Sequence, residues 1–390
     1  MRGPRSTSAR STEPSATLAE VRSELDRALA RLRAWDADEL LPSVQQPGEL
    51  TVQLVDELAA RLRAGGKRLR PVFALWGWVA AGGHPTGGPP MNGGPPTNGG
   101  PPTNGGPPTN GSRRTLVELA AALELLHLFA LVQDDVMDRS DTRRGLPTMH
   151  VTAARRHRAS DGLGDPVLFG DSVAILLGDL ALAEASMLVA AAPAAVRELW
   201  RHMVVELVHG QLWDLTQAAS RERRIEVSTV IARLKTGRYT VTRPLQLGAL
   251  VAGADPELVA QLGSFGDRVG DAFAIRDDIL GVWGDPAATG KPAGDDLRSA
   301  KPTVLLALAQ QAAPADGQEI MRRCNAGTLD DAGVAELRER LVQWGVREQA
   351  EAQIDRLVRD ADAILGTLDI DPQAAAALRA LVTATAWRSA

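Results

Sequence analysis

The sequence predicts an all-α fold, and three observations support this prediction. Apolar residues recur at helical spacing along most of the chain, whereas the strict alternation typical of strands is scarce. Alanine and leucine, which are good helix formers, dominate the apolar residues. Aromatic residues make up only 4% of the 390 residues. We therefore expect a large helical bundle.

Composition excludes several classes of protein. The chain is 44% hydrophobic and 23% charged, and its formal net charge of -5 gives no basic field that would point to nucleic acid. The single cysteine, Cys324, excludes a disulfide framework and a cysteine-based metal site. It fits a reducing compartment, and we expect a cytoplasmic protein. The apolar run 173–192 contains Asp179 and Glu184, so we interpret it as a buried core helix and expect no membrane span.

Two segments have too little apolar character to fold. Residues 1–16 are predicted to be a disordered tail, with a transit peptide as the alternative for the first ten residues. Residues 87–110 contain four hexapeptides, GGPPMN followed by three copies of GGPPTN. We interpret 82–113 as a disordered insertion, because Pro-Pro in every unit argues against a hexapeptide β-helix. A partner that recognises polyproline is a second interpretation. Residues 17–390 are otherwise expected to form a single all-α domain.

The helices follow one another with short breaks. The first begins near Leu18 and ends before the Pro and Gly residues at 42–48. The second has its apolar face between Val52 and Leu62 and stops at Gly65-Gly66, and Pro71 is well placed to begin the third, 71–80. Further helices are expected near 115–138, 171–191, 196–218, 226–251, 257–284, 302–312, 331–344, 347–366 and 373–388.

The end of the predicted helix 115–138 carries three carboxylates. Asp134 and Asp138 lie one turn apart on one face, and Asp135 lies about 100° round from Asp134. Stacked carboxylates repel each other unless a cation joins them, and Mg²⁺ binds one or two carboxylates together with water and phosphate. Arg143 and Arg144 follow, and arginine is suited to bidentate phosphate binding. The stretch indicates a diphosphate site, and a solvated helix end followed by a charged turn is the alternative.

A second acidic pair, Asp277-Asp278, lies near the end of the predicted helix 257–284. Such a pair is costly to bury without a cation, and facing helices in a bundle can hold a metal between them. Several basic residues lie in places suited to an anion. Lys67 and Arg70 follow a Gly-Gly turn at a helix start, Lys235-Thr236-Gly237 interrupts a helix, and Lys291 and Lys301 lie on a loop that could close over a ligand. Taken singly, each lysine is by default a surface charge and His127 a core histidine.

Together these motifs resemble those of the trans-isoprenyl diphosphate synthases of the polyprenyl synthetase family, of the geranylgeranyl and farnesyl type. The motifs are GGKRLRP (65–71), DDVMD and RRG (134–145), LGD (177–179), KTG (235–237) and RDDILGVWGD (276–285). They follow in the right order from about Leu18 onward. The resemblance implies an isoprenoid-synthase-type helical bundle around a deep apolar cavity. It also implies an Mg²⁺-dependent prenyltransferase that condenses isopentenyl diphosphate with an allylic diphosphate, usually as a homodimer.

The resemblance also implies a role for each motif residue. Three Mg²⁺ ions are expected, two on Asp134 and Asp138 and one on Asp277, with Asp135 and Asp278 as supporting charges. The allylic diphosphate is expected to bind Arg143, Lys235 and Lys291, with Lys301 nearby. Isopentenyl diphosphate is expected to bind Lys67, Arg70, His127 and Arg144. The carbonyl of Lys235 and the hydroxyl of Thr236 would face the carbocation.

Departures from the family pattern leave alternatives open. Gly281 stands where the family usually has a third Asp, and Ala274 stands beside Phe273 where the family often has Gln. A non-catalytic partner subunit would be expected to lose its metal-binding aspartates, and a class I terpene cyclase needs no second diphosphate site. Phe129, five residues before Asp134, is predicted to form the floor of the cavity. We therefore expect geranylgeranyl diphosphate as the product, with farnesyl diphosphate as the alternative.

Overall fold

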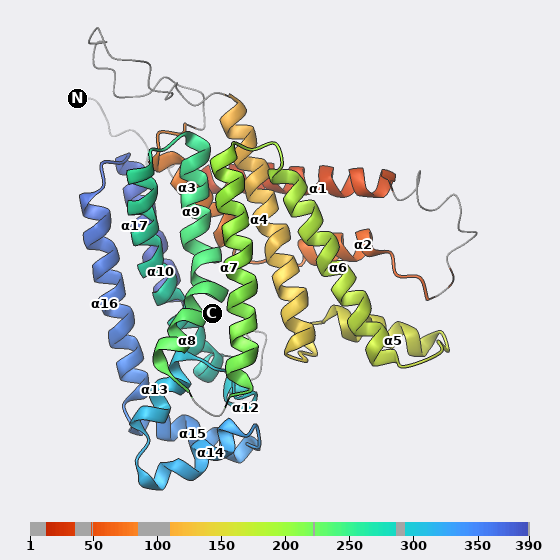
Figure 1. The fold of residues 1–390 in the computed structure, drawn as a ribbon, viewed down its shortest axis with the longest axis vertical. Coiled ribbons are helices and arrows are strands. Elements are labelled where there is room, and N and C mark those ends of the chain that lie inside the picture. The colour runs from red at the N-terminus through yellow and green to blue at the C-terminus, as the bar shows by residue number, and fades with distance from the viewer. Residues whose placement is uncertain are drawn as a thin grey trace, which may run out of the picture. The chain divides into compact units, whose positions relative to one another are not determined.

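The computed structural model describes residues 13–35, 48, 50–84, 110–220, 223–285 and 293–388. Within these residues the fold is helical, and the strands are confined to one two-stranded hairpin. The all-α prediction is confirmed (Figure 1). The repeat residues 85–109 and Lys291 lie outside the described part of the chain.

The elements follow in this order. They are α1 (Glu13–Trp35), α2 (Leu54–Arg63), α3 (Leu69–Ala80), α4 (Asn110–Met137), β1 (Thr142–Arg143), β2 (Leu146–Pro147), α5 (Met149–Ala159), α6 (Pro166–Val189), α7 (Ala194–Ala218), α8 (Ile225–Ala232), the π-helix η4 (Arg233–Thr242), α9 (Arg243–Ala252), α10 (Pro256–Trp283), α12 (Asp295–Arg298), α13 (Val304–Ala312), the 3₁₀-helix η5 (Ala315–Gly317), α14 (Gln318–Asn325), α15 (Asp331–Gln343), α16 (Val346–Thr367) and α17 (Pro372–Ala386).

The chain divides into two compact units, which are described separately. Unit 1 consists of the described residues up to Leu75, of those within Gly82–Ala194 and of Val251–Gly253. Unit 2 consists of the described residues within Trp76–Ala81 and Ala195–Leu250 and of those from Ala254 onward.

Three long helices begin with the same two residues, and the chemistry explains why. Asp165, Asp255 and Asp371 each accept a hydrogen bond from a backbone N–H in the first turn of α6, α10 and α17, respectively. Each is followed by proline, which fixes a helical φ and lacks the N–H that would otherwise be unsatisfied there. The Asp-Pro pair therefore fixes where each of these helices begins.

Unit 1 is built around the pairing of α4 with α6, with α1, α2 and α5 packed against them (Figure 1). The middle of α4 is completely buried, as shown by Leu119, Leu123 and Leu126. Glu124 is also buried there and forms an ion pair with Arg68. A buried carboxylate needs such a partner, so this pair ties the loop before α3 to the centre of α4.

Unit 2 is built around α10, which packs against η4, α16 and α17. Glycines allow the close approach of α10 to η4. A Cβ atom at Gly237 would lie 2.9 Å from the backbone carbon of Gly270, and a Cβ at Gly270 would lie 2.9 Å from the Cα of Gly237. Any larger residue at either position would force these two helices apart.

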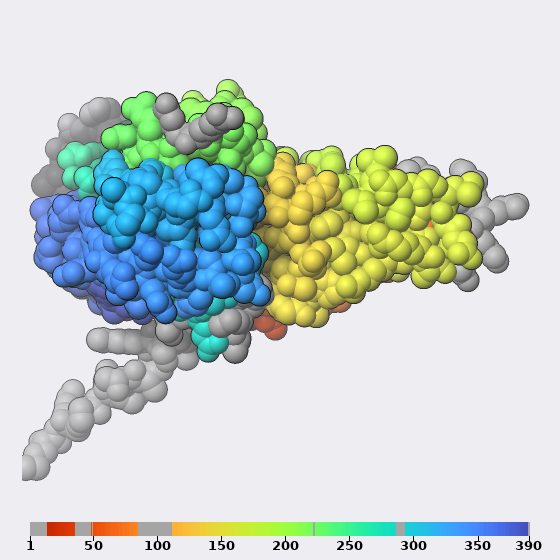
Figure 2. Space-filling model, turned by 90° about the horizontal axis from the view of Figure 1, so that it is seen from below, coloured from red at the N-terminus to blue at the C-terminus, as the bar shows by residue number. Residues whose placement is uncertain are grey.

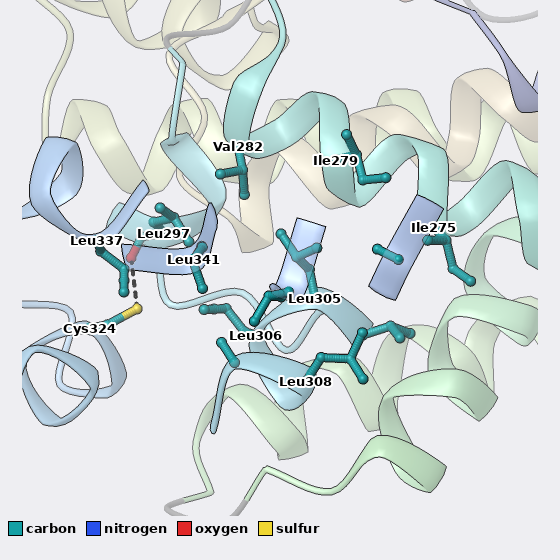
Figure 3. Packing of buried hydrophobic residues seen from close by; sticks show 14 of the residues in the cluster. Ile275, Ile279, Val282, Leu297, Leu305, Leu306, Leu308, Cys324, Leu337 and Leu341 are labelled. Carbon is teal, nitrogen blue, oxygen red and sulfur yellow. Dashed lines mark hydrogen bonds between the residues drawn. The ribbon is translucent and has the colours of Figure 1, made fainter. Parts of the chain in front are cut away.

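The opposite side of α10 contributes to a hydrophobic cluster, part of which is drawn in Figure 3. Ile275, Ile279 and Val282 of α10 are 1–3% exposed and join residues of α12 and α13 in this cluster. Leu297 of α12 is completely buried, and its carbonyl accepts a hydrogen bond from the thiol of Cys324. Helices α14, α15 and α16 supply further residues of this cluster, and Figure 2 shows the outer surface of this part of the chain in blue. The short helix α12 is thus anchored by its buried leucine.

Some predicted boundaries were wrong. The helix α1 already begins at Glu13, inside the predicted tail 1–16, and α4 begins at Asn110, inside the predicted insertion 82–113. In both cases a few polar residues extend a helix whose apolar pattern starts later, because a growing helix adds residues without a new nucleation cost. The short helices α5, α12 and α14 were not predicted, since their apolar periodicity is brief.

Two described helices are long and apolar enough to cross a membrane, by length and composition only. They are Gly111–Met137 and Pro166–Val189, with mean hydropathies of 1.9 and 1.8 over an 18-residue window. Core helices of soluble proteins pass the same test, and 67% of the first window is buried. These two helices are therefore weak evidence for a membrane span. The expectation of no membrane span stays a prediction.

Candidate active site

The carboxylates at the end of α4 differ in their surroundings. The helical hydrogen bonding continues to Asp138, whose N–H donates to the carbonyl of Asp134 at 2.8 Å. Asp134 and Asp138 therefore lie on successive turns, as predicted. Asp134 is half-buried and Asp138 exposed, whereas Asp135 is only 5% exposed. Asp134 and Asp138 are thus the accessible carboxylates, and Asp135 points into protein.

The hairpin β1–β2 brings Arg143 to these carboxylates. Its two-residue turn, Arg144-Gly145, has φ values of 54° and 75°, as the primed hairpin turns require. Arg143 donates two hydrogen bonds to Asp135 Oδ1, at 2.8 and 2.5 Å, and one to Asp134 Oδ2 at 3.2 Å. Burial opposes the positive charge of Arg143, but Asp135 and Asp134 outweigh it and raise the pKa of the guanidinium. Arg143 is therefore a charged partner of both aspartates.

The next arginine joins the hairpin to the Gly-Gly turn before α3. Arg144 donates a hydrogen bond to the carbonyl of Gly65. A Cβ atom at Gly66 would lie 2.8 Å from Nη2 of Arg144, and Gly66 has a φ of 148°. Only glycine allows this backbone conformation with the guanidinium so close. The structure thus brings together two motifs that are far apart in the sequence.

His127 lies among arginines and is half-buried, and its assignment to isopentenyl diphosphate stays a prediction. Burial, followed by the charges of Arg70, Arg144, Arg143 and Arg68, lowers the pKa of His127 well below its ordinary value. The imidazole is therefore neutral near pH 7 and can donate one N–H. Arg70 is buried and Lys67 exposed. This cationic group of unit 1 brings His127 together with Arg70 and Arg144, three of the four residues predicted to hold isopentenyl diphosphate.

The carboxylates of α4 suit Mg²⁺ better than a metal that needs a complete protein cage. Asp134 and Asp138 supply hard oxygen donors one turn apart, and Mg²⁺ completes its octahedron with water and phosphate. Among the residues that the structure describes, no three His, Cys, Asp or Glu side chains gather closely enough to hold a metal ion. The residues therefore fit Mg²⁺ provided that a ligand such as a diphosphate contributes further oxygens.

The second acidic pair lies on α10 in unit 2. Asp277 lies about 160° round the helix from the side that carries Ile275, Ile279 and Val282, so it points away from the hydrophobic cluster. It is half-buried and forms an ion pair with Arg388, which follows α17. Arg388 was not among the predicted site residues.

Asp278 has a different role from its neighbour. Its Oδ2 accepts a hydrogen bond from the N–H of Val304, 2.9 Å away, at the start of α13. Burial, and then the nearby charge of Asp296, raises the pKa of Asp278 to about 7, although Lys301 opposes this rise. Asp278 thus connects α10 to α13 and to the loop that carries Lys301.

The same loop explains why this chain has Gly281 where the family usually has a third aspartate. A Cβ atom at Gly281 would collide with the carboxylate of Asp296, which therefore occupies the space of a side chain at this position. The N–H of Gly294 donates to the carbonyl of Gly281 at 3.1 Å and holds the loop in place. Where the family pattern has an aspartate on α10, this chain has a carboxylate from α12.

We expect Asp278→Asn to change how stability depends on pH. The unfolded chain loses this proton near pH 4 and the folded chain near pH 7, so the folded state holds more protons between these values. The parent should therefore lose stability as pH rises from about 4 to about 7, and the variant should lose less. Melting temperatures of both proteins between about pH 5 and pH 8 measure this difference. Parallel curves would contradict it.

The lysine predicted to bind the allylic diphosphate lies in the π-helix η4. A π-helix has hydrogen bonds between residues five apart, which widens the turn, and such segments occur frequently at functional sites. The ammonium of Lys235 is 2.5 Å from Oδ2 of Asp214 on α7, and these side chains are 14% and 8% exposed. A Cβ at Gly210, one turn before Asp214, would lie 2.7 Å from the backbone N of Lys235. Gly210 thus lets η4 approach α7, and Asp214 orients the lysine.

Two other predicted positions, Thr236 and Ala274, lie in unit 2, and three residues that contact the candidate site were not predicted. Thr236 is half-buried beside Lys235, and Ala274 is 3% exposed inside α10. The missed residues are Asp214, Asp296 and Arg388. Only Asp214 carried a usable signal, because an aspartate within an apolar helix needs a cation.

The comparisons with known proteins show the family of this chain. The family model of polyprenyl synthetase matches residues 52–341. A geranylgeranyl pyrophosphate synthase from Corynebacterium glutamicum, solved with isoprenyl diphosphate and magnesium, is 36% identical, with a TM-score of 0.80 over 97% of this chain and 99% of that one.

Two relatives are each 32% identical. One is a geranylfarnesyl diphosphate synthase from Aeropyrum pernix, matched over 63% of this chain and 66% of its own length. The other is a (2E,6E)-farnesyl diphosphate synthase from Mycobacterium tuberculosis, matched over 67% and 70%. The names of these relatives differ in the product. The motifs, the helical fold and the family match together establish that this chain belongs to the polyprenyl synthetase family, the Mg²⁺-dependent trans-isoprenyl diphosphate synthases.

Proposed function

We propose that this chain condenses isopentenyl diphosphate with an allylic diphosphate and releases geranylgeranyl diphosphate. The observation that carries this proposal is the arrangement on α4. His127 and Asp134 are seven residues apart and so lie on one face, about 10 Å apart along the axis. A cationic group surrounds His127, and a carboxylate pair begins at Asp134. Such an arrangement suits one diphosphate bound directly by cations and another bound through Mg²⁺.

The proposed mechanism gives each motif residue the role that the family resemblance implies. Lys67, Arg70, His127 and Arg144 hold isopentenyl diphosphate, and Arg143 holds the allylic diphosphate. Asp134 and Asp138 hold two Mg²⁺ ions. When bound, Mg²⁺ neutralises the charge that develops on the leaving pyrophosphate. His127 is suited to donate a ring N–H to a diphosphate oxygen.

Asp277 is proposed to hold the third Mg²⁺ ion, and Lys235 and Lys291 are proposed to hold the allylic diphosphate, with Lys301 nearby. Breaking the allylic C–O bond gives a carbocation, which the isopentenyl double bond attacks, and the proton lost afterwards goes to the released pyrophosphate. The carbonyl of Lys235 and the hydroxyl of Thr236 are dipoles suited to stabilise the cation.

The test is an assay of the purified chain with labelled isopentenyl diphosphate and a five-, ten- or fifteen-carbon allylic primer. We expect incorporation from each accepted primer to stop at twenty carbons. No incorporation by the folded protein with Mg²⁺ present would overturn the catalytic proposal and favour a non-catalytic partner subunit. A product that stops at fifteen carbons would overturn only the chain length.

The product length is proposed to depend on Phe129. Ala130 lies one turn before Asp134 on the same face, and its small side chain leaves room for a prenyl chain. Phe129 is half-buried, about 7–8 Å before Asp134 along the helix axis, and its ring would block further growth.

We therefore expect Phe129→Ala to give products longer than twenty carbons. Chromatography of the dephosphorylated products measures this, with Phe129→Tyr as the control that keeps a ring. Unchanged products from a folded alanine variant would remove Phe129 as the determinant of length.

A homodimer is also proposed, and apolar surface supports it. On α6, Leu168, Leu176 and Met187 are 56–67% exposed. On α7, Val208 and Leu212 are 48% and 55% exposed. Exposed large apolar side chains on either helix are suited to contact with a second copy of the chain. Light scattering of the purified chain tests the proposal, and a monomer at micromolar concentration would contradict it.

A further inference from the structure

The residue that follows α17 by two positions lies directly against the second acidic motif. Arg388 forms an ion pair with Asp277, and its guanidinium carbon is 4.2 Å from the centre of the Phe273 ring. Phe273 and Asp277 are four residues apart on α10, so they share one face. The side chain of Arg388 is 12% exposed, whereas that of Asp277 is 44% exposed. The guanidinium therefore covers this face of α10 and leaves part of the carboxylate open to a ligand.

A second arginine fixes the segment that carries Arg388. Arg276 donates from Nε to the carbonyl of Ala386 at 2.6 Å, and its two terminal nitrogens donate to Glu351 at 2.9 and 2.5 Å. Its guanidinium carbon lies 5.4 Å from the centre of the Trp387 ring. These contacts hold the end of α17 against α10. The approach of Arg388 to Asp277 is thus set by the fold and not by a chance encounter of two surface side chains.

We propose that Arg388 is a resident counter-ion of Asp277 that competes with a metal ion for this carboxylate unless a diphosphate binds at the same time. This inference rests on the metal-binding role proposed above for Asp277. A guanidinium beside a carboxylate repels an incoming divalent cation through the same Coulomb interaction that attracts the aspartate. A diphosphate reverses the balance, because it is attracted to both the metal and the arginine.

Arg388 therefore couples the binding of metal and diphosphate at unit 2. It makes binding of metal alone weaker and joint binding of metal and diphosphate stronger, and such coupling acts equally on both ligands. Arg143 is placed similarly in unit 1, because it binds Asp134 and Asp135. The difference is that the resemblance assigns Arg143 to the substrate, whereas nothing in the sequence motifs assigns Arg388.

The experiment measures Mn²⁺ binding to the full chain with and without inorganic pyrophosphate. Mn²⁺ is used as a spectroscopic substitute for Mg²⁺. The starting protein carries Asp134→Ala and Asp138→Ala, so that Asp277 is the carboxylate of interest, and a further Asp277→Ala variant defines the signal from that site. Arg388→Gln tests the arginine because its planar amide can still pack on Phe273, and Arg388→Lys restores the charge. Arg379→Ala is the matched control, since Arg379 lies on α17 in an exposed pair with Asp362.

We expect Arg388→Gln to bind Mn²⁺ alone about tenfold more tightly than its parent and to bind Mn²⁺ with pyrophosphate about tenfold more weakly. Arg388→Lys and Arg379→Ala should resemble the parent. Equal affinities for Arg388→Gln and the parent in both conditions would overturn the inference. If Asp277→Ala leaves Mn²⁺ binding unchanged, the metal role of Asp277 fails instead. Melting temperatures show whether each variant is folded. If the glutamine variant is not, Arg388→Met, which keeps a long side chain over Phe273 without the charge, is measured in its place, and affinities equal to those of the parent would again overturn the inference.

Discussion

Asp134→Ala is expected to lower kcat by about 10³-fold while the helix content stays the same. Asp134 is proposed to hold Mg²⁺ on the leaving group, so its loss removes an interaction that is strongest in the transition state. The fold should tolerate the change, because Arg143 keeps both of its hydrogen bonds to Asp135. Steady-state kinetics at saturating substrate and Mg²⁺, together with circular dichroism, measure the two quantities.

The neighbouring aspartate provides a matched contrast. Asp135 is 5% exposed and is the main partner of Arg143, so Asp135→Ala should lower the melting temperature as well as the rate. Asp26→Ala, an exposed carboxylate on α1, should change neither. Activity of the parent that persists in EDTA, or an Asp134→Ala variant with the rate of the parent, would exclude the metal role.

Asp214→Ala should reduce the free energy of unfolding by about 3 kcal/mol, because it leaves the ammonium of Lys235 buried without its carboxylate. Both side chains are largely buried, so solvent screens the pair only weakly. The kcat should also fall, by about 10²-fold, because the ammonium of Lys235 would no longer be held in the orientation that binds the allylic diphosphate. Urea denaturation measures the first effect and kcat the second.

A double variant separates the two effects of Asp214. In Asp214→Leu with Lys235→Met, both charges are replaced by apolar groups of similar size, so most of the stability should return while activity stays low. Asp214→Asn keeps a hydrogen-bond acceptor and should lie between the parent and Asp214→Ala. If the double variant is less stable than Asp214→Ala, the pair is not the source of the lost stability.

Sequence alone predicted the parts of this molecule that depend on local chemistry. The long helices could be predicted from apolar periodicity, and the residues of the first acidic motif lie as their spacing required, with Asp134 and Asp138 on successive turns of α4. The family resemblance assigned Lys67 and Arg144 to the same diphosphate, but the sequence did not predict the contact between Arg144 and the Gly-Gly turn. The contact itself depends on a hairpin of two-residue strands that has almost no periodic signal.

The remaining features depend on contacts between distant segments. Arg388 meets Asp277 across more than a hundred residues, and no spacing rule predicts an ion pair at that separation. Asp296 occupies the space beside Gly281 because Leu297 anchors α12 in the core. The sequence also did not predict the π-helical geometry of η4, because a π-helix and an α-helix can have the same amino-acid composition.

The contact between Gly237 and Gly270 has a consequence for the thermodynamics of ligand binding. Gly237 lies two residues after Lys235, and Gly270 lies two helical turns before Asp277. Because the backbones of η4 and α10 touch there, the helices cannot slide past each other without a collision. The ammonium and the carboxylate proposed to act on one diphosphate are thus carried on a rigid pair of helices before any ligand arrives. A preorganised site loses little conformational entropy when a ligand binds, so more of the electrostatic attraction remains as binding affinity. Gly237 and Gly270, which have no side chains, make this preorganisation possible.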